Sequence, residues 1–279
     1  MKKRLKTRFG VQLGALCGEI RADKNQNTTD AVRWNRKMKN RMINLTKATL
    51  LSATLVAAAM TSPIPASAGN PNPGIFPVNA APGGKSYGQW TAAWWQWAVS
   101  APAGQNPWFD DTTGQFAAAG QSGQVWFLGA SLGGSVERSF TIPQGKMLFL
   151  PVTPWIFGSV AGDCGASNPS VTCDVPTLRD SAAVAATSVQ TMEVSIDEVP
   201  VQDIRRYRAI SPDSFSVTLP QGDVFGLPAG TYTPQVADGY WLMLAPLAAG
   251  THTITVHVIP NPSFGGEFRV IYHLTVGTP

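Results

Sequence analysis

The chain has three histidines, and all of them lie near its C-terminal end in two segments that alternate polar and apolar residues. Histidine serves as a general base beside a nucleophile, and its ring nitrogens bind zinc. In 251–258, His252 shares a face with apolar residues and His257 shares a face with threonines. If 268–276 pairs with this segment, His257 and His273 lie on one outer face. Two histidines could begin a metal site, but no third ligand is evident. We therefore expect one half-buried and two solvated histidines, and no metal.

Carboxylates are the second candidate for chemistry. Glycosidases act with two facing carboxyl groups, and Asp110, Asp111 and Glu137 are candidates for such a pair. The segment 110–114 is more simply a turn, in which an aspartate side chain accepts hydrogen bonds from nearby backbone. Neither G-x-S-x-G nor H-E-x-x-H occurs in the chain. A secreted hydrolase that uses these carboxylates is therefore our alternative interpretation.

Tryptophan is the third candidate, since the chain has nine and eight of them follow residue 68. Flat aromatic faces stack on sugar rings and on other planar or apolar ligands. Trp90, Trp94 and Trp97 recur at helical spacing, which predicts a buried stripe. Four other tryptophans lie off that stripe or in and near predicted loops, and we expect them to be exposed and to contact a ligand. These four are Trp95, Trp108, Trp155 and Trp241.

Arg138 lies in a predicted strand, 136–142, on the same face as Val136, Phe140 and Ile142. An arginine on an apolar face needs a carboxylate partner or a path to solvent. We expect a structural ion pair, with contact to a ligand as the alternative. The candidate ligand-binding residues are therefore Trp95, Trp108, Trp155, Trp241, Arg138, Asp110 and Asp111.

Two helices and about nine strands must position these residues. A helix is predicted from Ser86 to about Ser100, because Ser86 and Gln89 form a capping box. A second is predicted from Pro176 to Gln190, with Thr177 as its cap. We expect loops at 153–175 and 220–238. The predicted strands are 124–130, 136–142, 147–152, 192–196, 199–204, 215–219, 240–245, 251–259 and 267–276.

This pattern predicts a mainly β fold. Short alternating strands without a βαβ repeat favour an antiparallel β-sandwich with two helices packed on it, and a jelly roll is one arrangement of this kind. The strands and helices form a single domain over 86–279, which follows a flexible lead-in at 69–85. A Rossmann or α/β-barrel enzyme is disfavoured.

The residues before this domain predict export. Lys39, Arg41 and Lys47 give a positive region at the start of segment 42–68. An apolar run of about 13 residues and the small residues Ala66-Ser67-Ala68 follow, and together these features are typical of a cleavable Sec-type signal peptide. The apolar run is shorter than the ~20 residues of a membrane-spanning helix. Residues 1–41 are a basic extension that we do not expect in the mature protein. We therefore expect a periplasmic or extracellular protein without a membrane span after cleavage.

Charge and cysteine content agree with this division. Residues 69–279 hold 8 Lys and Arg against 14 Asp and Glu, a net charge of −6, so the basic character belongs to the leader. A domain of this charge has no electrostatic footprint for nucleic acid. Cys164 and Cys173 remain after cleavage, and in an oxidising compartment we expect them to form a disulfide. A metal site is the rival interpretation for this pair.

The stretch 87–97 reads Tyr-Gly-Gln-Trp-Thr-Ala-Ala-Trp-Trp-Gln-Trp, the pattern Y-x-x-W-x-x-x-W-W-x-W. With segments 120–128, 143–146, 238–241 and 250–254, it resembles a family of secreted bacterial proteins of no established activity. The resemblance covers nearly all of the predicted mature chain and implies an exported β-rich domain. The export signal, the sandwich pattern and the loop aromatics together predict a non-catalytic domain. We expect it to need no cofactor and to bind a glycan or another component of the cell envelope.

Overall fold

A computed structural model describes residues 71–72, 74–163 and 174–277. The predicted signal peptide, the extension before it and both cysteines of the predicted disulfide lie outside these residues. Within the described part of the chain, no helix is long and apolar enough to cross a membrane.

The fold is mainly β, as predicted, and consists of two five-stranded sheets and two α-helices. Sheet A has the order β1-β3-β8-β6, and β7 also pairs with β8. Its strands are β1 (Val125–Phe127), β3 (Met147–Gly158), β6 (Arg208–Ile210), β7 (Phe215–Leu219) and β8 (Gly230–Leu244). Sheet B has the order β2-β10-β9-β4-β5. Its strands are β2 (Gly134–Pro143), β4 (Thr191–Ile196), β5 (Val199–Pro200), β9 (Gly250–Ile259) and β10 (Phe268–Gly277).

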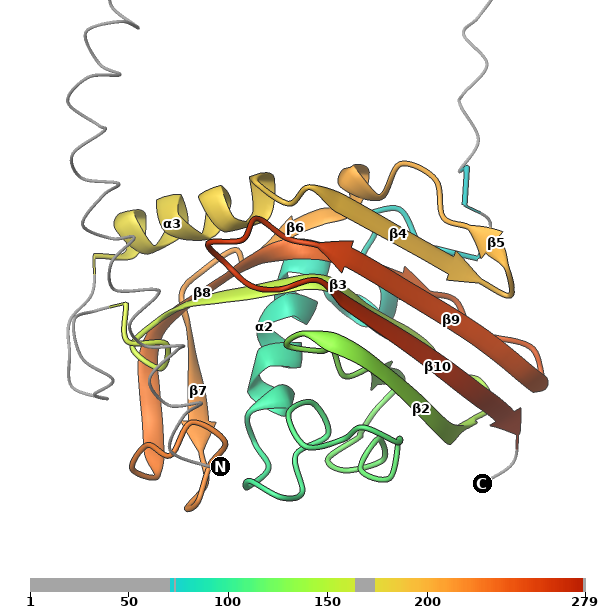
Figure 1. Cartoon of the computed structure of the whole chain (residues 1–279), viewed down its shortest axis with the longest axis horizontal. Helices are drawn as coiled ribbons and strands as arrows, with labels where there is room; N and C mark the ends of the chain where they lie inside the picture. The colour runs from blue at the N-terminus through green and yellow to red at the C-terminus, as the bar shows by residue number, and fades with distance from the viewer. Residues whose placement is uncertain (1–70, 73, 164–173, 278–279) are drawn as a thin grey trace, which may run out of the picture. The chain divides into compact units, whose positions relative to one another are not determined.

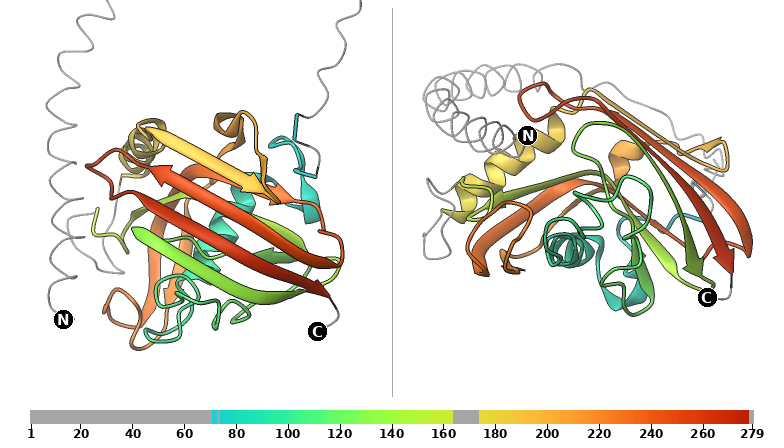
Figure 2. Two further views of the ribbon diagram at one scale, coloured as in Figure 1. Left: turned by 45° about the vertical axis from the view of Figure 1, so that its right-hand side comes forward. Right: turned by 60° about the horizontal axis from the view of Figure 1, so that its bottom comes forward.

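Sheet A lies between helix α2 (Tyr87–Ala98) on one face and, on the other, helix α3 (Val175–Thr187) together with sheet B (Figures 1 and 2). Alternation along the strands explains these layers, because successive side chains point to opposite faces. Trp241 of β8 contacts Trp94 of α2, whereas Val236 packs with α3. Both faces of sheet A are therefore buried.

Helix α2 begins where the sequence predicts. The Ser86 side chain accepts a hydrogen bond from the Gln89 N–H, and the Gln89 side chain accepts one from the Ser86 N–H, which completes the capping box. Helix α3 begins one residue before the predicted start, with Asp174 as the N-cap residue. The prediction that Thr177 caps this helix is therefore wrong. Its hydroxyl instead donates to the Asp174 carboxylate.

The sheets differ from the prediction in pairing. β1 is parallel to β3 and β2 is parallel to β10, so both sheets are mixed and not antiparallel throughout. The long connections from β1 to β3 and from β2 to β10 allow this, because parallel neighbours need a crossover.

Two predicted loops are partly strand. β3 continues to Gly158 because its end pairs with β8, and β8 begins at Gly230 because its beginning pairs with β7. The lead-in also differs from the flexible segment that we expected. Ile75 is buried and bridges Leu244, and the Phe76 N–H donates to the Met243 carbonyl.

Candidate functional site

Three of the four tryptophans predicted to be exposed are buried. Trp95, Trp108 and Trp241 expose 2%, 6% and 0% of their surface, so the prediction that they contact a ligand at the surface is wrong. Their rings pack edge to face around Trp94, with centroid separations of 5.3 Å to Trp241 and 5.7 Å to Trp108. The tryptophan motif of α2 therefore builds a core between the helix and sheet A.

Trp95 lies off the predicted stripe but is buried by a segment that follows the helix. The ring of Trp108 stands 5.0 Å from that of Trp95, and Asn106 anchors this segment by donating to the Ala98 carbonyl at 2.8 Å. Residues 99–124 thus cover a side of α2 that helical spacing alone leaves open. Trp155 is half-buried, and its ring contacts Phe264.

Arg138 is buried, as its apolar face predicts, but its partners are not carboxylates. Among the described residues it forms no ion pair. Its Nε donates to the Asp111 carbonyl at 2.8 Å, and its terminal nitrogens donate to the carbonyls of Trp108 (3.3 Å) and Ala130 (2.9 Å) and to that of Gly129. The predicted ion pair is therefore wrong. The guanidinium instead joins two loop segments to β2 through the backbone, and with 2% of its surface exposed it is closed to a ligand.

Asp110 and Asp111 are turn residues, which supports the simpler of the two interpretations of this segment. Asp111 is buried, and its carboxylate accepts from the N–H groups of Thr113 (3.2 Å), Gly114 (2.6 Å) and Phe116 (3.1 Å). Asp110 accepts from two N–H groups of the preceding loop. Both carboxylates are occupied by backbone hydrogen bonds and hold the loop that supplies Arg138 with acceptors.

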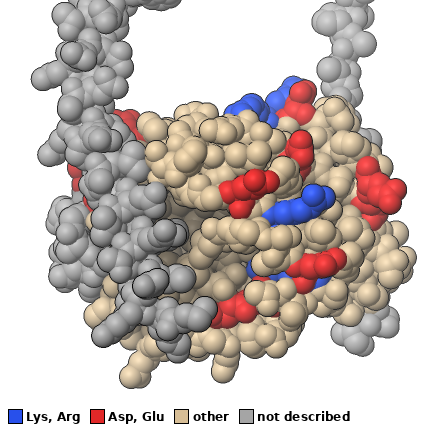
Figure 3. Space-filling model, viewed as in Figure 1, with Lys and Arg blue, Asp and Glu red and all other residues tan. Residues whose placement is uncertain are grey.

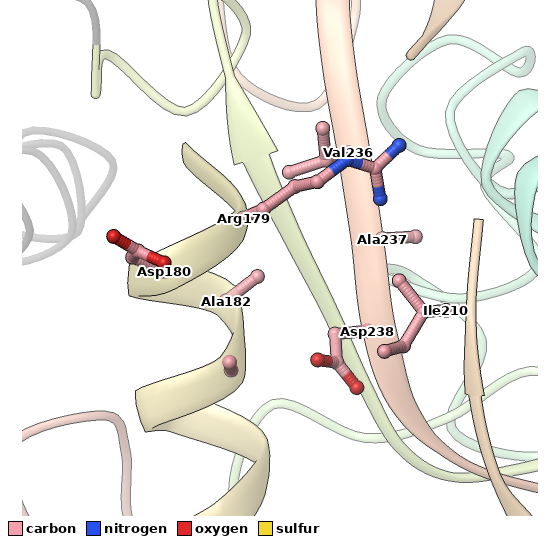
Figure 4. A pocket seen from close by; sticks show the side chains of 8 residues that line it. Arg179, Asp180, Ala182, Ile210, Val236, Ala237 and Asp238 are labelled. Atoms are coloured by element: carbon pink, nitrogen blue, oxygen red, sulfur yellow. The ribbon is translucent and has the colours of Figure 1, made fainter. Parts of the chain in front are cut away.

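A pocket of about 230 Å³ lies between α3, β6 and β8 (Figure 4). Its charged groups already have partners. Asp238 forms a two-bond ion pair with Arg208, at 2.9 and 2.6 Å, and Arg179 donates to two backbone carbonyls. The hydrogen bond to Asp238 raises the pKa of Arg208. In Figure 4 the Asp180 carboxylate points away from that of Asp238, so this pocket does not present a facing pair of carboxylates.

The outer face of sheet B offers more polar groups. Here β4, β9, β10 and β2 lie side by side, and no described element covers them (Figure 2). Their outward side chains form four rows across the strands. The rows are Glu193–His257–Arg269–Ser135, Ser195–Thr255–Ile271–Glu137, Thr253–His273–Ser139 and Thr251–Thr275–Thr141. Acidic and basic side chains lie close together over this sheet (Figure 3). We call the residues of these four rows the outer face.

The histidines of sheet B each contact a carboxylate. His257 bonds Glu193 at 3.0 Å and Glu267 at 2.8 Å, and His273 bonds Glu137 at 2.7 Å. The prediction that His257 and His273 share an outer face is confirmed, since β9 and β10 pair as a hairpin. The register does not bring them together, because His257 is opposite Arg269 and His273 is opposite Thr253.

The hydroxyl groups of the outer face are open for binding. None of its serine and threonine side chains has a hydrogen-bond partner among the described residues. Unlike Asp110, Asp111 and Arg138, these groups keep their full capacity to donate and accept. These hydroxyl groups are not among the residues predicted to bind a ligand. The alternation Thr251, Thr253, Thr255 was the signal that could have identified them.

The described residues contain no group of three or more His, Cys, Asp and Glu side chains arranged to hold a metal ion. The outer face is therefore a surface of hydroxyls, carboxylates and imidazoles, and we take it as the candidate site. Comparison of the chain with family models, curated protein sequences and solved structures gives no match, so the resemblance carried by the tryptophan motif stays a prediction.

Proposed function

We propose that this protein is an exported, non-catalytic binding domain and that its outer face binds a glycan. The observation that carries the proposal is the set of unpartnered hydroxyls on four adjacent strands. Adjacent strands are about 4.8 Å apart and every second residue along a strand about 6.8 Å. A polyhydroxylated ligand could form several hydrogen bonds to such a surface at once.

The surroundings of these hydroxyls suit a neutral, hydroxyl-rich partner. Glu193 lies beside His257, which lies opposite Arg269, and Glu137 bonds His273. Acidic and basic side chains therefore alternate on the face. Mixed charge favours neither a polyanion nor a polycation over long range. Carboxylate groups beside hydroxyls are also good acceptors for sugar hydroxyl groups.

The alternative, a hydrolase with two carboxylates, has less support. Asp110 and Asp111 are committed to backbone N–H groups, and Glu137 lies on an open face with His273 as its partner. A hydrolase positions its substrate in a cleft from which water is excluded. A flat surface of open hydroxyls suits binding without reaction.

A glycan-array screen of the purified protein tests the proposal. The double variant Thr251→Ala, Thr275→Ala removes two hydroxyls that lie opposite each other on β9 and β10, and little else. If each makes one neutral hydrogen bond to the ligand, affinity for the best glycan should fall roughly tenfold or more.

The matched control is Thr218→Ala, Thr231→Ala. These two threonines are exposed on sheet A and bond each other at 3.1 Å, so the control removes the same groups from a different surface. It should leave affinity unchanged. Binding to no glycan, or a loss of binding confined to the control, would show that the outer face is not a glycan site.

A further inference from the structure

His257 lies between two carboxylates, and both of its ring nitrogens are used. Nδ1 is 3.0 Å from Glu193 Oε2 and Nε2 is 2.8 Å from Glu267 Oε1. An ionised carboxylate oxygen can only accept a hydrogen bond, and a neutral imidazole has only one N–H. Both contacts are therefore hydrogen bonds only when the ring carries two protons.

His252 has the same arrangement at the other end of β9. Its Nδ1 is 2.6 Å from Asp197 Oδ2, in the turn between β4 and β5, and its Nε2 is 2.9 Å from the Ala248 carbonyl oxygen. A carbonyl oxygen also only accepts. Asp197 in addition accepts from the Thr253 N–H at 2.8 Å, so this carboxylate ties the turn to β9.

We propose that His252 and His257 are two proton-dependent clamps that fasten the segments around sheet B to β9. As imidazolium ions, His252 joins the β4–β5 turn to the 245–249 loop, and His257 joins β4 to the segment that leads into β10. After loss of one proton, each ring keeps one hydrogen bond and turns a lone pair toward the other acceptor. The segment on that side is then released.

The charges around each ring decide its direction of titration. His257 faces Glu193 from β4 and Glu267 from the segment before β10, while Arg269 on β10 opposes protonation. The two carboxylate hydrogen bonds raise the pKa of His257. His252 faces Asp197, with Glu198 next in that turn and the uncharged Leu274 opposite on β10. Partial burial lowers the pKa of His252, but the bonds to Asp197 and Ala248 outweigh it, so the pKa is raised.

The sign of the effect follows from these directions. A histidine whose folded pKa is raised contributes its full stabilisation below the ordinary value of 6.5 and loses it as pH rises through the folded pKa. The clamps therefore hold in mildly acidic solution and open as pH rises through the raised pKa of each ring. This inference concerns the fold of sheet B and does not depend on the proposed glycan.

Nuclear magnetic resonance on the purified protein tests it, with a titration from about pH 5 to about pH 9 that follows the ring nitrogens and the amide protection factors. Two amides report on the clamps: Thr253, bonded to Asp197, and Phe264, which lies in the loop before Glu267. We expect both rings to carry two protons at the acid end. We expect protection, corrected for the intrinsic pH dependence of exchange, to fall about two- to fivefold through each titration, as suits a partly exposed pair.

Isosteric amides separate the clamp from general packing. In Asp197→Asn and Glu267→Gln the new NH₂ group can donate to a neutral imidazole, so protection of the corresponding amide should no longer depend on pH. His273→Gln, which removes a histidine of the same sheet with a single carboxylate partner, should leave the pH dependence of the Phe264 amide unchanged. The Thr253 amide is left out of this control, because Thr253 lies opposite His273. Rings that hold a single proton at acidic pH, or an unchanged pH dependence in the amide variants, would overturn the proposal.

Discussion

Replacement of Arg138 is the sharpest test of how the fold is held together. Its guanidinium is buried and bonds four backbone carbonyls, two in the segment 108–111 and two in the segment 129–130. Arg138→Met keeps the aliphatic stem but leaves these carbonyls without the donor. We expect this variant to lose about 3–5 kcal/mol of stability. A buried polar group left without a partner costs about 1–3 kcal/mol, so four such groups with partial relaxation agree with that range.

The assay is urea unfolding followed by tryptophan fluorescence, because the indole cluster includes Trp108, whose carbonyl is one of the acceptors. With a slope of about 2 kcal/mol/M, the unfolding midpoint should fall by about 1.5–2.5 M. Arg138→Lys keeps the charge, but a single ammonium group cannot reach both loop segments in the same way. We expect it to lose about half as much stability.

Arg269→Met is the matched control. Arg269 lies on β10, the neighbour of β2, but on the outer face, where it is exposed. Its replacement should change stability by less than about 0.5 kcal/mol. If Arg138→Met lowered the free energy of unfolding by no more than this control, the four hydrogen bonds from Arg138 to backbone carbonyls would not be what holds the two loop segments to β2.

Two further substitutions test other parts of the fold. Gly88→Ala should destabilise the protein by about 1–3 kcal/mol in thermal or urea unfolding, because the new Cβ would lie 2.1 Å from the Ile210 carbonyl oxygen. This clash outweighs the better helix propensity of alanine, which is about 1 kcal/mol. A stabilised variant would show that α2 can move away from β6. Burial raises the pKa of Asp163 from 3.8 to about 6, and the hydrogen bond from the Gly158 N–H opposes this. The contribution of Asp163 to stability is therefore greatest below about pH 4 and is lost as pH rises through about 6, by about 3 kcal/mol at 1.36 kcal/mol per pH unit. Asp163→Asn should remove this loss in urea unfolding at about pH 4 and pH 7, and an equal pH dependence in both proteins would contradict the assignment.

Local signals predicted local structure well. The capping box set the start of α2, and the alternation of Phe215, Val217 and Leu219 identified β7 at its observed bounds. The predicted strands 192–196 and 199–204 leave Asp197 and Glu198 between them, and the structure has a turn there, with both residues in the left-handed region of backbone conformation. In each case the information lies within a few neighbouring residues.

Predictions from the sequence are wrong where burial depends on distant segments. β8 is covered by α2 on one face and by α3 and sheet B on the other, so its sequence does not alternate and its Gly- and Pro-containing beginning resembled a loop. Trp95 was predicted to be exposed because helical spacing shows one stripe of α2, but residues 99–124 bury a second side. Arg138 was correctly predicted to be buried, because it shares a strand face with apolar residues. Its hydrogen-bond acceptors could not be predicted, because they are backbone carbonyls and have no sequence signature.

The sequence predicts the part of the candidate site that lies on β9 and β10, but not the part on β2 and β4. Alternation in β9 and β10 placed His257, His273 and the threonines on one face, and a hairpin was enough to join them. The remaining half depends on strand order. β2 pairs in parallel with β10, although more than a hundred residues separate the two strands in the chain. On the other side of the hairpin, β4 pairs with β9 and adds Glu193. Residue spacing in the sequence cannot predict a surface whose side chains come from four different strands. Binding residues on such a face are therefore identified from the register of the strands and not from sequence motifs.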